Sequence, residues 1–115
     1  MATETELDRD PTEMPRNNKG YDIQSRTNDL GELLFIEVKG RASGANEFTI
    51  TKSEILTSLN RPDHFVLALV EVRDDDSTTV RYLRKPFKGT EDIYFDMTSA
   101  NYRWNDYFDR AEAPA

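Results

Sequence analysis

The sequence predicts an α/β or α+β fold in which a mixed sheet carries a packed helix. Three features lead to this expectation: alternating apolar and polar residues in "YDIQSR" and "ELLFIEVKG", a capped helical pattern in "TKSEILTSLN", and the nearly continuous apolar run "HFVLALVEV". Such a run is typical of a strand that is buried on both faces at the centre of a sheet. The 115 residues suffice for one domain with its own core.

The first half of the chain is expected to form a helix and then a three-strand antiparallel meander. Residues 3–10, within an acidic segment that spans 1–16, are predicted to be a short helix followed by an extended arm with two prolines. The main domain, residues 17–115, then opens with "YDIQSR" and "ELLFIEVKG", which form a hairpin around the turn "TNDLG". "EFTI" is predicted to be the third strand of this meander.

The second half is predicted to contain a helix, the central strand and several shorter elements. Thr51 and Glu54 have the spacing of a capping box, which predicts a helix that begins after Thr51 and ends before Pro62. After the strand "HFVLALVEV", the turn "RDDDS" leads into a strand at "TTVRYLR". For the remainder we expect irregular structure at "DIYFD", an edge strand at "SANYRW" and a terminal helix at "NDYFDRAE".

The composition excludes several classes of site. The chain has no cysteine and a single histidine, so a disulfide framework, a thiolate zinc site, a cysteine nucleophile and a Ser-His-Asp triad are not supported. The start lacks a signal peptide pattern, and the run "FVLALV" is far shorter than the roughly 20 residues of a membrane helix. We therefore expect no membrane association and a cytoplasmic location.

The charge is acidic overall but unevenly distributed. A formal net charge of −7 argues against a polyanionic partner. The distribution of the bases is nevertheless compatible with a local basic face, because they cluster in "RYLRKPFK" and near the hairpin. The alternative is an ordinary solvated edge strand on which arginine stems pack. The candidate nucleic-acid contacts are Lys19, Arg41, Lys52, Arg81, Arg84 and Lys85.

The hairpin brings two acids and a base together. Side chains alternate along a strand, so Glu37 and Lys39 share one face while Ile36 and Val38 occupy the other. The turn brings Asp22 next to Glu37, and two converging carboxylates need a proton, a cation or generous solvation. Mg²⁺ or Mn²⁺, held by both acids and the main-chain carbonyl of Val38, would meet this need. Lys39 would then orient or deprotonate a water, or stabilise charge on a phosphate. The alternative is a solvated polar face of an amphipathic strand.

These residues also carry a family resemblance. "NNKGYDI", "FIEVKGR", "FTITKSEI", "HFVLALVEV" and "PF", over roughly residues 17–88, resemble a domain-of-unknown-function family. That family is found at the C-terminus of the plant protein NO VEIN and of many bacterial and archaeal helicase-like and restriction-associated proteins. It is similar to the PD-(D/E)XK nuclease superfamily, whose fold is restriction-endonuclease-like.

The resemblance implies roles for individual residues. Asp22 and Glu37 would be the metal-binding acids and Lys39 the catalytic lysine, with DNA as the substrate. The first helix of the superfamily often adds a glutamate, for which only Glu6 or Glu4 is available here. Glu54 is a further candidate, although its capping role explains it without chemistry.

The leading hypothesis is thus a nuclease-like domain over residues 17–115 that binds DNA and hydrolyses its phosphodiester bonds with Mg²⁺ or Mn²⁺. Its expected partner is a helicase-like protein of a restriction or defence system, or such a domain upstream in the same polypeptide. A homodimer would cut both strands, as many nucleases of this fold do. The rival hypothesis is a catalytically inactive module of the same fold that docks DNA or a partner protein. A third hypothesis is an acid/base hydrolase that acts on sugars. It is less favoured, because metal binding explains the positioned carboxylate pair better.

Overall fold

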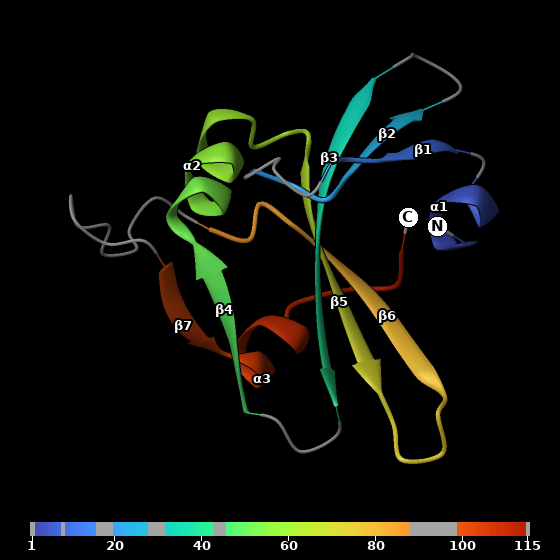
Figure 1. The fold of residues 1–115 in the computed structure, drawn as a ribbon, viewed down its shortest axis with the longest axis vertical. Helices are drawn as coiled ribbons and strands as arrows, with labels where there is room; N and C mark the ends of the chain where they lie inside the picture. Colours follow the sequence, from blue (N-terminus) through green and yellow to red (C-terminus); the bar gives the residue numbers. More distant parts are fainter. Residues whose placement is uncertain are drawn as a thin grey trace.

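The computed structural model describes residues 2–7, 9–15, 20–27, 32–42, 46–87 and 99–114. These residues form a mixed five-stranded sheet in the order β1-β2-β3-β5-β6, a separate two-stranded sheet of β4 and β7, and short helices packed on both sides (Figure 1). The elements in chain order are α1 (Ala2–Glu6), β1 (Arg9–Glu13), β2 (Ile23–Thr27), β3 (Leu33–Ala42), β4 (Glu47–Thr51), α2 (Lys52–Asn60), β5 (Phe65–Val72), β6 (Thr78–Arg84), β7 (Ser99–Arg103) and α3 (Trp104–Phe108).

The predicted hairpin is present. β2 and β3 pair antiparallel with Ile23 opposite Ile36, and the Thr27 N–H donates to the Glu32 carbonyl at the turn. β5 lies between β3 and β6, and its residues from Phe65 to Leu69 are buried, which confirms the prediction of a central strand. The turn after β5 and the strand at "TTVRYLR" are also confirmed.

The N-terminal arm differs from the expectation. The first helix ends at Glu6, and residues 9–13 are not helical but form β1, which pairs antiparallel with β2. Pairing satisfies main-chain groups on the outer edge of β2, and Pro11 is tolerated because β1 is itself an edge strand. Alternation of apolar and polar residues could not have predicted β1, because its residues are mostly polar.

The third strand of the predicted meander also differs. β4 forms at "EFTI", but it pairs antiparallel with β7 in the small sheet rather than with β3. The free side of β3 is instead occupied by β5, which runs parallel to it. Parallel neighbours need a crossover connection, and β4 together with α2 supplies it. The meander of the main sheet is therefore β1-β2-β3.

Helix α2 begins and ends as the sequence predicts. The Glu54 N–H donates to Thr51 Oγ1 at 3.1 Å, and the Thr51 N–H donates to Glu54 Oε1 at 2.9 Å, which together make a capping box. At the other end the Arg61 N–H donates to the Thr57 carbonyl, directly before Pro62. Ile55 is fully buried and faces the sheet.

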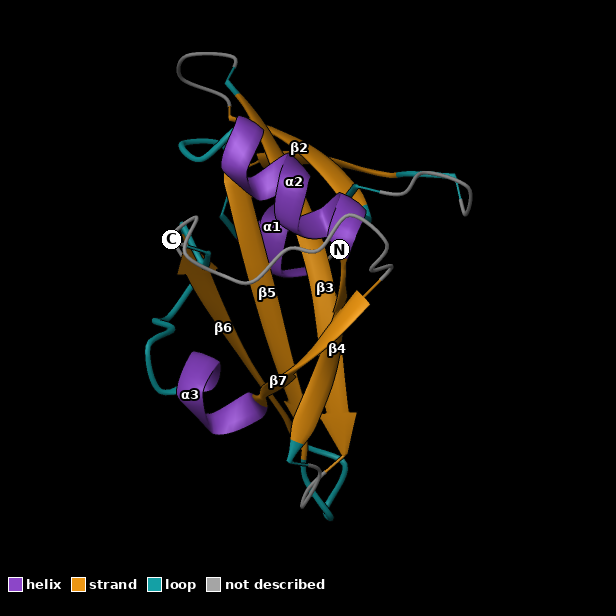
Figure 2. Ribbon diagram, turned by 90° about the vertical axis from the view of Figure 1, so that its left-hand side faces the viewer, coloured by secondary structure: helices purple, strands orange, loops and turns teal. Residues whose placement is uncertain are grey.

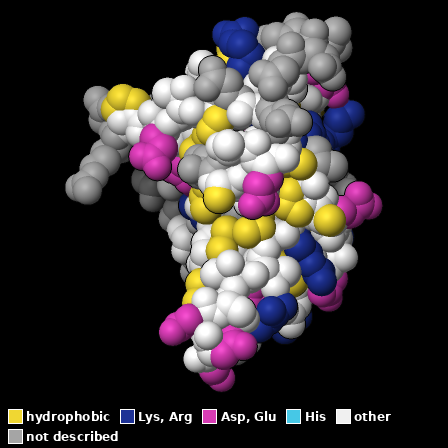
Figure 3. Space-filling model, turned by 90° about the vertical axis from the view of Figure 1, so that its right-hand side faces the viewer, with side chains coloured by type: hydrophobic (Ala, Val, Ile, Leu, Met, Phe, Trp, Pro, Cys, Tyr) yellow, Lys and Arg dark blue, Asp and Glu magenta, His cyan; other side chains and the backbone are white. Residues whose placement is uncertain are grey.

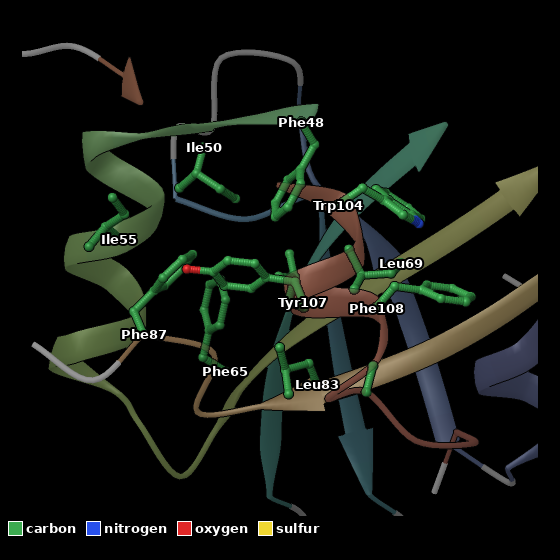
Figure 4. Packing of buried hydrophobic residues seen from close by; sticks show 12 residues of the cluster. Phe48, Ile50, Ile55, Phe65, Leu69, Leu83, Phe87, Trp104, Tyr107 and Phe108 are labelled. Carbon is green, nitrogen blue, oxygen red and sulfur yellow. The ribbon is translucent and has the colours of Figure 1, made fainter. Parts of the chain in front are cut away.

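The larger core lies between the main sheet and the layer formed by α2, the β4–β7 sheet and α3, which all cover one face of the sheet (Figure 2). Burial of this many apolar side chains is the main favourable contribution to folding. Trp104 and Phe108 of α3 are stacked, and the Tyr107 ring packs edge-on to Phe48 (Figure 4). The cluster consists of Phe48, Ile50, Ile55, Phe65, Leu67, Leu69, Leu83, Phe87, Trp104, Tyr107, Phe108 and Ala111.

The C-terminal elements agree in part with the predictions. β7 confirms the edge strand, and α3 is a helix that ends at Phe108, earlier than expected. Beyond α3 the chain crosses to β6, where Tyr82 and Glu112 exchange two main-chain hydrogen bonds. The segment "DIYFD" lies outside the described residues. None of the helices in the described part of the chain is long and apolar enough to span a membrane.

The opposite face of the sheet carries a smaller core and α1. Figure 3 views this side and shows apolar side chains gathered across its middle. Glu4 of α1 is fully buried here, where its Oε2 accepts from the Tyr82 hydroxyl at 2.6 Å and its Oε1 lies 3.3 Å from Arg9 Nε. Burial and the Glu4 carboxylate raise the pKa of Tyr82 above its ordinary value, so the hydroxyl stays a donor. These contacts attach α1 to the sheet.

We expect Tyr82→Phe to lower the free energy of unfolding by about 1–3 kcal/mol, because it leaves a buried carboxylate short of a donor. Urea denaturation at pH 7 measures this loss. Tyr21→Phe is a matched control, since the Tyr21 hydroxyl makes a longer, part-buried bond of 3.4 Å to Gln24, and its cost should be smaller. Equal stabilities of Tyr82→Phe and the unaltered chain would contradict the prediction.

Candidate active site

Strand β3 places Glu37 and Lys39 on the face of the sheet that α2, the β4–β7 sheet and α3 cover. In the parallel pairing with β5, Glu37 lies opposite Leu67 and Lys39 opposite Leu69, both of which belong to the larger core. Ile36 and Val38 belong to the smaller core on the other face, as strand alternation predicts. Glu37 is only 3% exposed, whereas Lys39 is half-buried.

Asp22 lies next to β3, just before β2 begins. The Asp22 N–H donates to the Ile36 carbonyl at 2.9 Å, and the Asp22 carboxylate Oδ2 accepts from the Val38 N–H at 2.9 Å. The side chain of Asp22 thus continues the hydrogen-bonding ladder of β2 and β3 beyond Ile23, the first residue of β2. Asp22 is therefore held at the residue that follows Glu37 in β3.

The main chain of Val38 faces the same edge as Asp22. The Phe35 N–H donates to the His64 carbonyl on the β5 side of β3, whereas the Ile36 carbonyl accepts from the Asp22 N–H on the β2 side. N–H and C=O groups of alternate residues point to the same side of a strand, so the Val38 carbonyl also points to the β2 side. The Asp22 carboxylate and the Val38 carbonyl therefore lie at one edge of β3, beside the buried Glu37.

Lys39 lies between two carboxylates. Its Nζ is 3.3 Å from Glu37 Oε1 and 3.1 Å from Glu54 Oε1, with Glu54 Oε2 at 3.4 Å. The capping role predicted for Glu54 is confirmed, and the same side chain also reaches the candidate site. The capping-box spacing gave no sign of this second contact, because it depends on α2 beginning directly over β3.

Burial and proximity set the charges of this trio. Burial, followed by the nearby Glu54 carboxylate, raises the pKa of Glu37 from 4.5 to about 10. Burial disfavours the charge of Lys39, but Glu37 and Glu54 outweigh it and raise the Lys39 pKa. Burial also opposes ionisation of Glu54, but hydrogen bonds to Glu37 and Thr51 and the Lys39 charge lower the Glu54 pKa. Near neutral pH the trio is a protonated Glu37, an ionised Glu54 and an ammonium.

The donor set fits a hard divalent cation. Glu37 Oε2 is buried and accepts no hydrogen bond from the described residues, and the Asp22 carboxylate and the Val38 carbonyl offer further oxygens of the kind that Mg²⁺ and Mn²⁺ prefer. Within the described ranges, no three acidic or histidine side chains lie close enough to hold a metal ion. The protein would therefore supply two carboxylates and a carbonyl, with remaining ligands from water or substrate.

The first helix does not contribute to this cluster. Glu4 is held by Tyr82 and Arg9 on the opposite face of the sheet, and Glu6 is exposed on the same short helix. The sheet lies between α1 and Lys39. The expectation that Glu4 or Glu6 adds a third acid is therefore corrected.

The predicted nucleic-acid contacts that the structure describes are divided between the two faces of the sheet. The guanidinium of Arg81 donates to the Phe108 carbonyl at 3.0 Å and lies 4.2 Å from the centre of the Phe108 ring, so Arg81 holds α3 and is not free for DNA. Arg84 is exposed and, by alternation, faces the side of α1.

Lys85 pairs with Asp63 at 3.1 Å. Lys52 is the half-buried first residue of α2. Lys19 and the side chain of Arg41 lie outside the described part of the chain.

Gly20 brings the segment before Asp22 against α2. A Cβ atom at Gly20 would lie 2.4 Å from Thr57 Oγ1, which is closer than real atoms approach. The Thr57 hydroxyl is itself fixed, because it donates to the Ser53 carbonyl at 2.8 Å. A glycine is therefore required for this approach, and the sequence reasoning did not identify it.

Comparisons with known proteins agree with this architecture. The model of the family described as "Protein NO VEIN, C-terminal" matches residues 1–83. The fold is similar to that of Hjc, a Holliday junction resolvase from the archaeal hyperthermophile Archaeoglobus fulgidus, with a TM-score of 0.58 and 13% identity over 96% of this chain and 90% of that chain. None of the curated protein sequences matches. The predicted restriction-endonuclease-like fold is thus confirmed.

Glu37→Gln is expected to make stability less dependent on pH. The folded chain keeps a proton on Glu37 up to a pKa of about 10, whereas the unfolded chain releases it near 4.5. The stabilising contribution of Glu37 is therefore complete below pH 4.5 and is lost as the pH rises towards 10. A glutamine cannot ionise, so at pH 8 the variant should be more stable by about 1 kcal/mol or more, since one pKa unit corresponds to about 1.4 kcal/mol.

Urea denaturation at pH 4, 6 and 8 measures this difference. Glu13→Gln, at an exposed position of β1, is the control and should follow the unaltered chain at each pH. An advantage of Glu37→Gln that shrinks between pH 4 and pH 8 would show that Glu37 is ionised in the folded chain.

Proposed function

The chain belongs to the family of the C-terminal domain of protein NO VEIN, and from this membership and the geometry of β3 we propose that it is a metal-dependent nuclease-like domain that binds DNA and hydrolyses phosphodiester bonds. One observation carries the proposal: Lys39 Nζ lies 3.3 Å from the buried Glu37, while the Asp22 carboxylate is bound to the Val38 N–H on the same strand. Two acids and a lysine in this arrangement can hold a divalent ion and stabilise charge on a phosphate, which supports phosphodiester hydrolysis.

In the proposed mechanism, Asp22, Glu37 and the Val38 carbonyl would hold Mg²⁺ or Mn²⁺. The ion, when bound, neutralises phosphate charge and lowers the pKa of a water. Glu37 must lose its proton to become a ligand, so binding releases a proton and tightens as the pH rises. Asp22 is oriented for this role by the Val38 N–H, and Glu37 by the strand itself.

Lys39 acts on the reacting atoms in this proposal. Its ammonium donates to an oxygen of the scissile phosphate and stabilises the charge that develops during attack, or it orients the attacking water. The hydrophobic layer beneath the site restricts solvent around Glu37 and Lys39, which strengthens such interactions.

DNA is the proposed substrate because the structurally similar resolvase is named for a DNA junction. Lys52 and Lys85, with Lys19 and Arg41, are the proposed phosphate contacts, and each contact would make binding weaker at higher salt. We further propose that residues 17–115 act as the C-terminal module of a cytoplasmic helicase-like or restriction-associated defence protein, and that two copies cut the two strands.

A catalytically inactive docking module is the second candidate. Glu37 is protonated near neutral pH, Lys39 is engaged with two carboxylates, and α1 adds no further acid to the cluster. These features favour a module that keeps the fold without turnover.

Incubation with supercoiled and linear DNA and either Mg²⁺ or Mn²⁺ tests the proposal. Lys39→Ala is expected to reduce the cleavage rate by about 100-fold or more, within the range for loss of a positioned donor that stabilises transition-state charge. Arg73→Ala is the control, because Arg73 is an exposed base in the turn after β5 and is not one of the proposed phosphate contacts. Cleavage that survives Lys39→Ala contradicts the mechanism.

Calorimetric titration with Mn²⁺ separates the two candidates. A nuclease-like domain should bind the ion with release of a proton, and Asp22→Ala should abolish that binding. An inactive module should show no heat of binding, and Asp22→Ala should then change nothing.

A further inference from the structure

The helix cap of α2 and the lysine of the proposed active site share one carboxylate. Glu54 Oε1 accepts from the Thr51 N–H at 2.9 Å and lies 3.1 Å from Lys39 Nζ. We propose that Glu54 is a positioning residue that fixes the Lys39 ammonium to the first turn of α2. This inference deepens the proposed function and rests on it for its catalytic meaning, while the positioning itself is a separate physical claim.

A capping role alone does not account for the surroundings of Glu54. A capping box uses one carboxylate oxygen to accept the N-cap N–H, and it works well on exposed helices. Glu54 is instead buried, with 9% of its side chain exposed, and its second oxygen also faces Lys39, at 3.4 Å. A buried carboxylate is costly without a partner of opposite charge. Lys39 is that partner.

Lys39 needs a second anchor for its proposed role. A lysine side chain has four rotatable bonds and loses considerable rotamer entropy when it is held in one place. Glu37 is its nearest carboxylate on the same strand, but in the proposed function Glu37 gives its charge to a metal ion. Glu54 belongs to another element and is not a proposed metal ligand, so it can hold the ammonium in both states.

The position of Glu54 is itself well determined. Ile55 is fully buried against the sheet, and the close approach of Gly20 to Thr57 packs the segment before Asp22 against the second turn of α2. Helix α2 therefore contacts both parts of the proposed site: β3 through Glu54 and the Asp22 segment through Thr57. The geometry of the site depends on one short helix.

Two substitutions separate capping from positioning. Glu54→Gln keeps an oxygen that can accept the Thr51 N–H but removes the charge next to Lys39. Thr51→Ala removes the oxygen that accepts from the Glu54 N–H at 3.1 Å but leaves both Glu54 oxygens in place. We expect Thr51→Ala to lower the thermal midpoint with Lys39 still held, and Glu54→Gln to release Lys39 with a smaller change of midpoint.

The readout is the ¹⁵N NMR signal of the Lys39 ammonium in the metal-free chain, compared with that of exposed Lys85. In the unaltered chain and in Thr51→Ala, Lys39 should be restricted in motion and protected from exchange with water. In Glu54→Gln it should become as mobile as Lys85. Glu54→Asp, which keeps the charge, should restore part of the restriction.

An unchanged Lys39 signal in folded Glu54→Gln overturns the proposal. If Glu54→Gln does not fold, the unaltered chain still decides, because Lys39 as mobile as Lys85 overturns the proposal and restricted motion supports it. Cleavage assays separate this result from the proposed function. DNA that stays intact while Lys39 responds to Glu54→Gln counts against the nuclease alone, and cleavage with an unresponsive Lys39 counts against positioning alone.

If DNA is cut, the kinetics give a second readout. Glu54→Gln should lower kcat several-fold with little change in KM, because Lys39 acts on the reacting phosphate rather than on remote parts of the DNA. Thr51→Ala should keep the kcat of the unaltered chain below its thermal midpoint. A kcat that falls equally in both variants would mean that only the stability of α2 matters, and would overturn the proposal.

Discussion

The burial of Glu37 on the face of the sheet that α2 and α3 cover is the constraint on which the candidate site depends. A carboxylate placed next to Leu67 and the apolar layer above it loses most of its hydration, which costs several kcal/mol if it stays ionised and alone. The chain meets this cost by protonating Glu37 and by placing Lys39 beside it. Lys39, half-buried in turn, requires the ionised Glu54. Lys39 thus links the buried acid of β3 to the first turn of α2.

The sheet solves a second, similar problem on its other face. Glu4 is fully buried there and is compensated by Arg9 and the Tyr82 hydroxyl. The two buried acids belong to different layers and have separate partners, so α1 stabilises the face that is remote from Lys39. The restriction-endonuclease-like resemblance led us to expect a glutamate of the first helix at the site. In this chain that glutamate is used to attach the helix.

The features that could be predicted from the sequence depend on local rules. Alternation along β3 gives the shared face of Glu37 and Lys39, the short turn gives the approach of Asp22, and the spacing of Thr51 and Glu54 gives the cap. The features that could not be predicted depend on which segments meet in space. β4 pairs with β7 because β5 occupies the side of β3 that β4 would have needed, and Arg81 holds Phe108 because α3 packs under β6. No spacing in the sequence carries that information.

The same arrangement tolerates a change of charge without moving β3 or α2. Without an ion, the proton on Glu37 leaves Lys39 to balance Glu54, and Asp22 is oriented towards solvent by the Val38 N–H. A divalent cation that displaced the proton would balance the charges of Asp22 and Glu37 itself, and Lys39 would still be balanced by Glu54. The ammonium therefore has a partner of opposite charge in both states. This arrangement suits a site in which Lys39 must stay in one place after an ion has bound. The carboxylate that holds Lys39, that of Glu54, belongs to α2 and is not a proposed metal ligand.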